Sequence, residues 1–109
     1  MKLLMILLLI TGCNTLSSIN RDANSHAYIP GKYDCRMFAE AKYKALIANG
    51  YKDEDIKFVI TDYKKEPHVV LNVNGMILDN NYSEPYPATK ALQDGLTPES
   101  WIKYRNTPM

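Results

Sequence analysis

A cysteine in this chain has a setting that favours thiol chemistry. Cys35 follows Asp34 at the start of a segment with helical periodicity, so its sulfur is expected at the positive end of the helix dipole. That position stabilises a thiolate and lowers the pKa of a thiol. The alternative is an inert packed thiol, which is the usual fate of a lone cysteine.

His68 and Asp79 lie on two predicted strands that flank Asn74-Gly75, a strong sequence signal for a β-hairpin. With a two-residue turn, Val73 faces Met76, and His68 and Asp79 project from the same face as diagonal neighbours. The other face then carries only apolar residues: Val69, Leu71, Val73, Met76 and Leu78. This division supports the register, because a slip by one residue would exchange the two faces.

A thiolate nucleophile, an imidazole base and a carboxylate that orients the imidazole are the groups that acyl transfer requires. The sequence therefore offers Cys35, His68 and Asp79 as candidate catalytic residues. Simpler interpretations are a polar histidine at the edge of a strand and an aspartate that forms a turn before Asn80-Asn81.

The elements that must position these residues indicate an α+β fold. We expect a helix over 34–49, capped by Asp34 and ended by Asn49-Gly50, and strands over 56–63, 68–73 and 76–79. Residues 80–87 are expected to form a loop, and a second helix should begin at Thr97-Pro98 and cover one side of the sheet with Trp101, Ile102 and Tyr104. The expected core is an N-terminal helix that carries Cys35, packed on an antiparallel sheet of about three strands.

The first thirteen residues resemble an export signal. Met1-Lys2 is basic, residues 3–10 are an apolar run too short to cross a membrane, and Thr11-Gly12 precedes Cys13. Residues 10–13 are similar to the bacterial lipobox, in which the chain is cut before the cysteine and the cysteine is acylated. We expect a signal peptide over 1–12 and lipidation of Cys13. An uncleaved anchor, or an ordinary signal with a chance cysteine, is the alternative.

These expectations set the location and the domain limits. The chain would be exported and lipid-anchored to the cell envelope, on the outer membrane facing the periplasm in a Gram-negative host because Asn14 follows Cys13. A lipidated Cys13 cannot form a disulfide, so Cys35 stays a free thiol. Residues 13–32 are expected to be the lipidated cysteine and a polar tether, and residues 33–109 the domain.

The charge of the chain limits its partners. The sequence has 13 basic and 12 acidic residues, and removal of 1–12 takes away Lys2 and leaves 12 of each. Such a neutral chain gives no reason to expect nucleic acid as a partner. We expect a protein or peptide substrate and membrane attachment through lipid alone, while the oligomeric state stays open.

The order of the motifs resembles a known family. Asp34-Cys35 opens a helix with Ala39 and Lys42-Tyr43, and Gly50, residues 68–71 and residues 78–80 follow. This order is similar to the bacterial transglutaminase-like cysteine proteinases of the papain-like and transglutaminase-like superfamily, over about residues 33–80. The resemblance implies that Cys35 is the nucleophile, His68 the general base and Asp79 the residue that orients it.

The chain departs from this family in two ways. Tyr33, Arg36 and Met37 stand where members commonly have glycine and acidic residues. Some periplasmic relatives bind calcium through those acidic residues, and Arg36 argues against calcium here because that cation needs carboxylate oxygens. We therefore expect no metal and no cofactor.

The region before the motif is also short, which leaves the oxyanion hole open. The Cys35 backbone N–H is one candidate donor, and Asn24, His26 or Tyr28 is the second. The sequence does not choose among these three.

Three functions remain open from the sequence. The leading one is a membrane-anchored thiol acyl-transfer enzyme, a cysteine peptidase that acts on peptide or isopeptide amide bonds, or that cross-links when an amine replaces water. The second is a non-catalytic envelope lipoprotein that uses a degenerate transglutaminase-like scaffold, with the loop over 82–87, to bind a protein or a cell-wall polymer. The third is a small structural envelope protein without a ligand.

Overall fold

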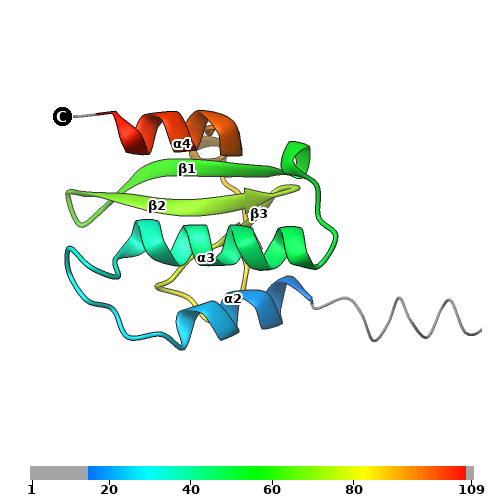
Figure 1. The fold of residues 1–109 in the computed structure, drawn as a ribbon, viewed down its shortest axis with the longest axis horizontal. Coiled ribbons are helices and arrows are strands. Elements are labelled where there is room, and N and C mark those ends of the chain that lie inside the picture. Colours follow the sequence, from blue (N-terminus) through cyan, green and yellow to red (C-terminus); the bar gives the residue numbers. More distant parts are fainter. Residues whose placement is uncertain (1–14, 108–109) are drawn as a thin grey trace, which may run out of the picture.

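The computed structural model describes residues 15–107 of the chain, so the predictions for the signal peptide and for Cys13 lie outside the described residues. The elements, labelled as in Figure 1, are α2 (Leu16–Asn24), α3 (Cys35–Ala48), β1 (Ile56–Tyr63), β2 (Glu66–Val73), β3 (Met76–Leu78), β4 (Tyr86–Pro87) and α4 (Pro98–Asn106), with short 3₁₀ turns at Asp53–Asp55 and Lys90–Leu92. Within 15–107, no helix is long and apolar enough to cross a membrane.

The four strands form one antiparallel sheet in the order β1-β2-β3-β4. Helix α3 runs along the sheet, α2 lies beside α3, and α4 lies beside β1 (Figure 1). The predicted fold class is confirmed: this is a small α+β protein in which the helix that carries Cys35 packs on an antiparallel sheet. The structure adds β4, a two-residue strand within the stretch expected to be a loop.

Helix α3 begins and ends where the sequence signals predict. The Asp34 carboxylate accepts a hydrogen bond from the Arg36 N–H at 3.2 Å and caps the first turn. The helix stops at Asn49, and Gly50 follows with a φ of +92°, which glycine adopts without strain. Ala39 and Leu46 are buried in the main core cluster, together with apolar residues of the sheet. This packing fixes the first turn of α3, and with it Cys35, against the strands.

The β2–β3 hairpin has the predicted register. Val73 pairs with Met76, and both turn residues have left-handed backbones, with φ of 52° at Asn74 and 90° at Gly75. Such a pair forms the type I′ turn that suits the twist of two-residue hairpins. The Asn72 side chain also accepts a hydrogen bond from the Gly75 N–H at 2.8 Å. The turn therefore fixes which residues of the two strands are neighbours.

Both faces of the sheet are covered. The face below α3 and α4 holds the larger cluster: Ile19, Ala39, Leu46, Ile56, Phe58, Val69, Leu71, Val73, Leu78 and Trp101. The opposite face holds Val59, Val70 and Ile77, packed against Tyr86, Ala88 and Leu92 from the segment after β3. This segment therefore returns under the sheet, and it brings Tyr86 to the interior.

Helix α2 corrects the expectation of a tether over 13–32. Thr15 caps it, and Ile19, only 2% exposed, joins the main core. Two asparagine side chains one turn apart donate hydrogen bonds to the loop after β3, Asn20 to the Tyr82 carbonyl at 2.8 Å and Asn24 to the Asp79 carbonyl at 3.0 Å. The segment looked like a tether because so few apolar residues anchor it, and polar side chains supply much of its docking.

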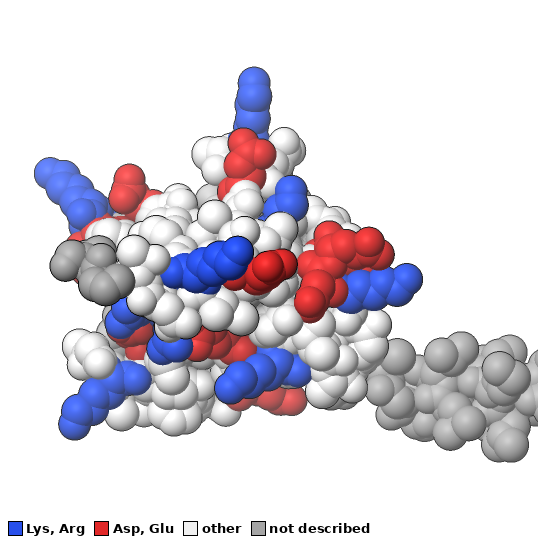
Figure 2. All heavy atoms as spheres, turned by 45° about the horizontal axis from the view of Figure 1, so that its top comes forward, with Lys and Arg blue, Asp and Glu red and all other residues white. Residues whose placement is uncertain are grey.

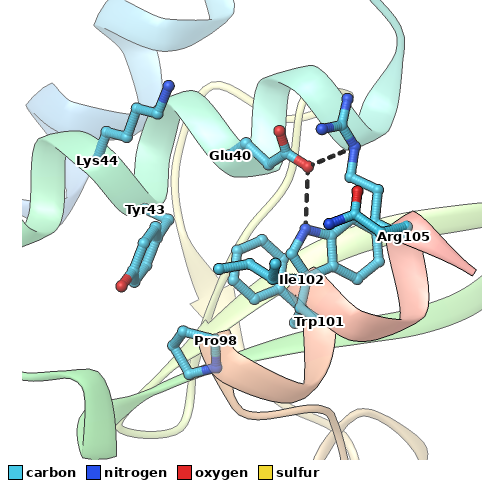
Figure 3. A pocket seen from close by; sticks show the side chains of 9 residues that line it. Glu40, Tyr43, Lys44, Pro98, Trp101, Ile102 and Arg105 are labelled. Carbon is cyan, nitrogen blue, oxygen red and sulfur yellow. Dashed lines mark hydrogen bonds and ion pairs between the residues drawn. The ribbon is translucent and has the colours of Figure 1, made fainter.

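Helix α4 is held by Trp101. Its ring stacks on Phe58, with the centroids 4.9 Å apart, and its N–H donates to the Glu40 carboxylate at 3.0 Å (Figure 3). Arg105 forms an ion pair with the same carboxylate at 2.8 Å. Trp101 thus covers the sheet as predicted, whereas Ile102 and Tyr104, each 55% exposed, do not.

Candidate active site

Cys35 is the first residue of α3, directly after the Asp34 cap, and its thiol is free and half-buried. Burial works against the charged thiolate, but hydrogen bonds from the His68 ring and from the Val69 backbone N–H outweigh it. The pKa of the Cys35 thiol is therefore lowered from its ordinary value. The helix dipole at this position acts in the same direction.

The His68 ring and the Asp79 carboxylate are in direct contact, as the hairpin register predicts. The distance from His68 Nε2 to Asp79 Oδ1 is 2.8 Å, and the two side chains are 8% and 4% exposed. Burial favours the neutral ring, yet the hydrogen bonds with Asp79 and Cys35 raise the pKa of His68 to about 9. His68 is therefore held as an imidazolium near neutral pH.

Asp79 is fixed by donors on both of its oxygens. Oδ1 also accepts the Asn81 backbone N–H at 2.9 Å, and Oδ2 accepts the Tyr86 hydroxyl at 2.8 Å. Burial alone would raise the pKa of Asp79, but these hydrogen bonds and the His68 charge lower it. The carboxylate is ionised and oriented before any substrate binds.

Strand β3 is shorter than β2, and this leaves part of the β2 backbone free to bond to the Cys35 thiol. Phe58 exchanges both of its backbone hydrogen bonds with Leu96, each at 2.8 Å, so its pairing with Leu71 is of the non-bonded type. Paired positions alternate, so the Ile60–Val69 pair is also non-bonded and the Val69 N–H points away from β1.

On that side β3 has already ended, because its last residue, Leu78, pairs with Leu71. The Val69 N–H therefore lacks a strand partner, and the Cys35 sulfur accepts from it. The first turn of α3 takes the place of the missing strand. This arrangement brings Cys35 to one side of the His68 ring while Asp79 holds Nε2.

The oxyanion donors proposed from the sequence have different outcomes. The Cys35 N–H has no acceptor within α3, as for any residue in the first turn of a helix. Asn24 is a wrong candidate because its side-chain amide already donates to the Asp79 and Tyr82 carbonyls, both at 3.0 Å. The His26 ring stacks on Tyr33 at 3.5 Å. Tyr28 is 54% exposed, and partial burial and the charge of Cys35 raise the pKa of its hydroxyl. This hydroxyl therefore remains a candidate oxyanion donor.

The Asp34 carboxylate, next to Cys35, already interacts with groups of the protein itself. Asp34 caps α3 and forms an ion pair with Arg36 at 3.1 Å, and Arg36 lowers the pKa of that carboxyl against the opposing effect of burial. Within residues 15–107, no cluster of three His, Cys, Asp or Glu side chains suits a metal ion.

Three residues around the triad were not predicted from the sequence: Tyr86, Asn81 and Lys42. Tyr86 lies in a stretch read as a loop, and nothing in its local pattern marks it. Asn81 follows Asp79 by two positions, the spacing at which an aspartate often accepts a backbone N–H, so this contact had a signal. Lys42 lies seven residues after Cys35, on the same face of α3, yet a lysine in a helix normally indicates a solvated position.

A separate hollow lies between α3 and α4, with a volume of about 150 Å³. Aromatic and aliphatic side chains line it, and the Glu40–Arg105 pair lies at its rim (Figure 3). None of its lining residues belongs to the triad. On the face drawn in Figure 2, acidic and basic side chains are interspersed and neither sign dominates.

No family model matches the chain, and neither the curated proteins nor the solved structures contain a match. The site is therefore defined by its own geometry: a small α+β protein in which a helix-start thiol, a buried imidazole and a buried carboxylate are linked in series.

Proposed function

We propose that this chain is a thiol acyl-transfer enzyme, a cysteine peptidase acting on peptide or isopeptide amide bonds. The observation that carries the proposal is the linked series of the Cys35 thiol, the His68 ring and the Asp79 carboxylate. The order of its motifs, which resembles the transglutaminase-like cysteine proteinases, supports the same reaction class.

The chemistry follows from the protonation states. The Cys35 thiolate attacks the amide carbonyl carbon, and the carbonyl oxygen becomes an oxyanion facing the Cys35 N–H. As the C–N bond breaks, the His68 imidazolium gives its proton to the leaving amine and a thioester remains. Water then attacks the thioester while His68 takes a proton from it, which releases the acid and restores the Cys35 thiolate and the His68 imidazolium. An amine in place of water would form a new amide.

Lipidation of Cys13 is part of the proposal. It would hold the enzyme at the cell envelope and restrict its substrates to proteins or peptides near that membrane. Cys13 would have no part in the reaction, because the proposed nucleophile is Cys35, which bonds to the His68 ring.

The loop over 82–87 gives little support to the alternative hypothesis of a non-catalytic binding protein. Tyr82 is 54% exposed, but Tyr86 turns inward and donates its hydroxyl to Asp79. An aromatic surface for a polymer would need both rings on the outside. The loop instead supports the candidate triad.

Acylation by p-nitrophenyl acetate tests the proposal. In the full chain with Cys13→Ser, Cys35 is the only thiol. We expect a rapid burst of about one equivalent of p-nitrophenol, followed by slow turnover, because the thioester accumulates. Mass spectrometry should find the acetyl group on Cys35. The matched control is Cys13→Ser with Cys35→Ser, which should give no burst. An equal burst from both proteins would contradict a nucleophilic Cys35.

A further inference from the structure

Lys42 is a buried lysine that the proposed mechanism does not use. Its side chain is only 1% exposed, and it lies two helical turns after Cys35 on α3. Within the described residues it forms no ion pair within 4.0 Å. Lysine is almost never fully buried without a partner, and an apolar residue at such a position is often more stabilising. Packing therefore gives no reason for a lysine here.

The charged group that interacts with Lys42 is Asp79, which belongs to the candidate site. Burial lowers the pKa of Lys42 to about 7, and the Asp79 carboxylate acts against that shift. The other titratable groups around this carboxylate are His68 from β2 and Tyr86 from β4, which both bond to it. Helix α2, which packs on α3, contributes Asn20 as a buried polar residue, and it is uncharged.

Asp79 is thus shared between two cations. Its oxygens are already occupied by His68, the Asn81 N–H and the Tyr86 hydroxyl, so Lys42 acts on it through space and not by a direct ion pair. In a buried site of low dielectric, such an interaction extends over several ångströms. A proton on Lys42 weakens the attraction that Asp79 exerts on a proton on His68, and the reverse also holds.

We propose that Lys42 is a positioning residue that regulates the acidity of His68 by competing with it for the Asp79 carboxylate. This inference rests on the proposed function, in which the His68 imidazolium must give a proton to the leaving amine. With Lys42 protonated, His68 is the stronger acid and releases that proton more readily. When Lys42 loses its proton, Asp79 holds the imidazolium more firmly.

Nuclear magnetic resonance titration of the His68 ring tests this coupling in the full chain with Cys13→Ser. Lys42→Arg keeps a positive charge at every pH, so the His68 midpoint should fall by about one pH unit. Lys42→Met should leave it unchanged, because Lys42 is already neutral where His68 titrates. Lys44→Arg, an exposed position on the same helix, is the matched control and should also leave it unchanged. An unchanged His68 midpoint in Lys42→Arg would contradict the inference, because a fixed positive charge at position 42 would then have no effect on the proton of His68.

The reciprocal measurement avoids any folding defect of Lys42→Arg. The Lys42 side-chain resonance should titrate near neutral pH, and in His68→Gln its midpoint should rise by about one pH unit because the competing imidazolium is gone. An unchanged Lys42 midpoint would overturn the inference. Neither titration involves acyl transfer. A normal acylation burst without coupling would therefore remove only the role of Lys42, whereas loss of the burst would remove the proposed function.

Discussion

Replacement of His68 by glutamine is expected to slow the acylation of Cys35 by p-nitrophenyl acetate about 10²–10⁴-fold. The imidazolium stabilises the thiolate, and it accounts for much of the lowered pKa of Cys35. Without it, burial and the adjacent Asp34 carboxylate both favour the neutral thiol. The measurement is the rate of the p-nitrophenol burst at neutral pH, in the background where Cys35 is the only thiol.

The chain offers a matched control for this change. His26 is the only other histidine; it is exposed and stacked on Tyr33, and its ring is not part of the triad. His26→Gln should leave the burst rate within a factor of a few. If both variants react as fast as the parent, His68 does not activate Cys35 and the triad has no catalytic meaning.

Replacement of Lys42 by methionine is expected to raise the free energy of unfolding by about 2–4 kcal/mol near pH 6–7. Burial lowers the pKa of Lys42 from 10.5 to about 7, so folding opposes its protonation. This cost is absent above the unfolded pKa of 10.5, grows as the pH falls and is complete below about 7. The gain in Lys42→Met should therefore be largest at neutral or acid pH and shrink towards pH 10.

Urea unfolding at pH 6.5 and again near pH 10 measures this effect. Lys44→Met is the control, because Lys44 is exposed on the same helix, and its change should stay within about 0.5 kcal/mol at both values. A loss of stability in Lys42→Met at pH 6.5 would show that the ammonium is stabilising where it lies. A gain would mean that the chain retains a destabilising lysine beside its candidate triad, a trade of stability for function that enzymes commonly show.

The parts of the fold and the site that local rules govern were predictable from the sequence. Asp34 and Gly50 are capping signals for α3, and Asn74-Gly75 is a turn signal. These signals fix short-range geometry, so they were sufficient to place Cys35 at a helix start and to bring His68 next to Asp79. Register follows from the turn because the side-chain period in a strand is two residues.

The parts that depend on contacts between distant segments were not predictable. Helix α2 has few apolar residues, and hydrogen bonds from Asn20 and Asn24 to the loop after β3 help to hold it. Tyr86 reaches Asp79 only because the chain passes back under the sheet. Lys42 looks solvated in a sequence, since burial of a charged side chain is a property of the assembled interior.

The central claim is that His68, oriented by Asp79, holds Cys35 as a thiolate. Its most direct test is the rate of Cys35 alkylation by iodoacetamide from about pH 4 to pH 10, in the full chain with Cys13→Ser. We expect the rate to rise with a midpoint below the ordinary thiol value of about 8.5, and the midpoint to return to that value or higher in His68→Gln. A midpoint at or above the ordinary value in the parent chain, unchanged in His68→Gln, would contradict the claim.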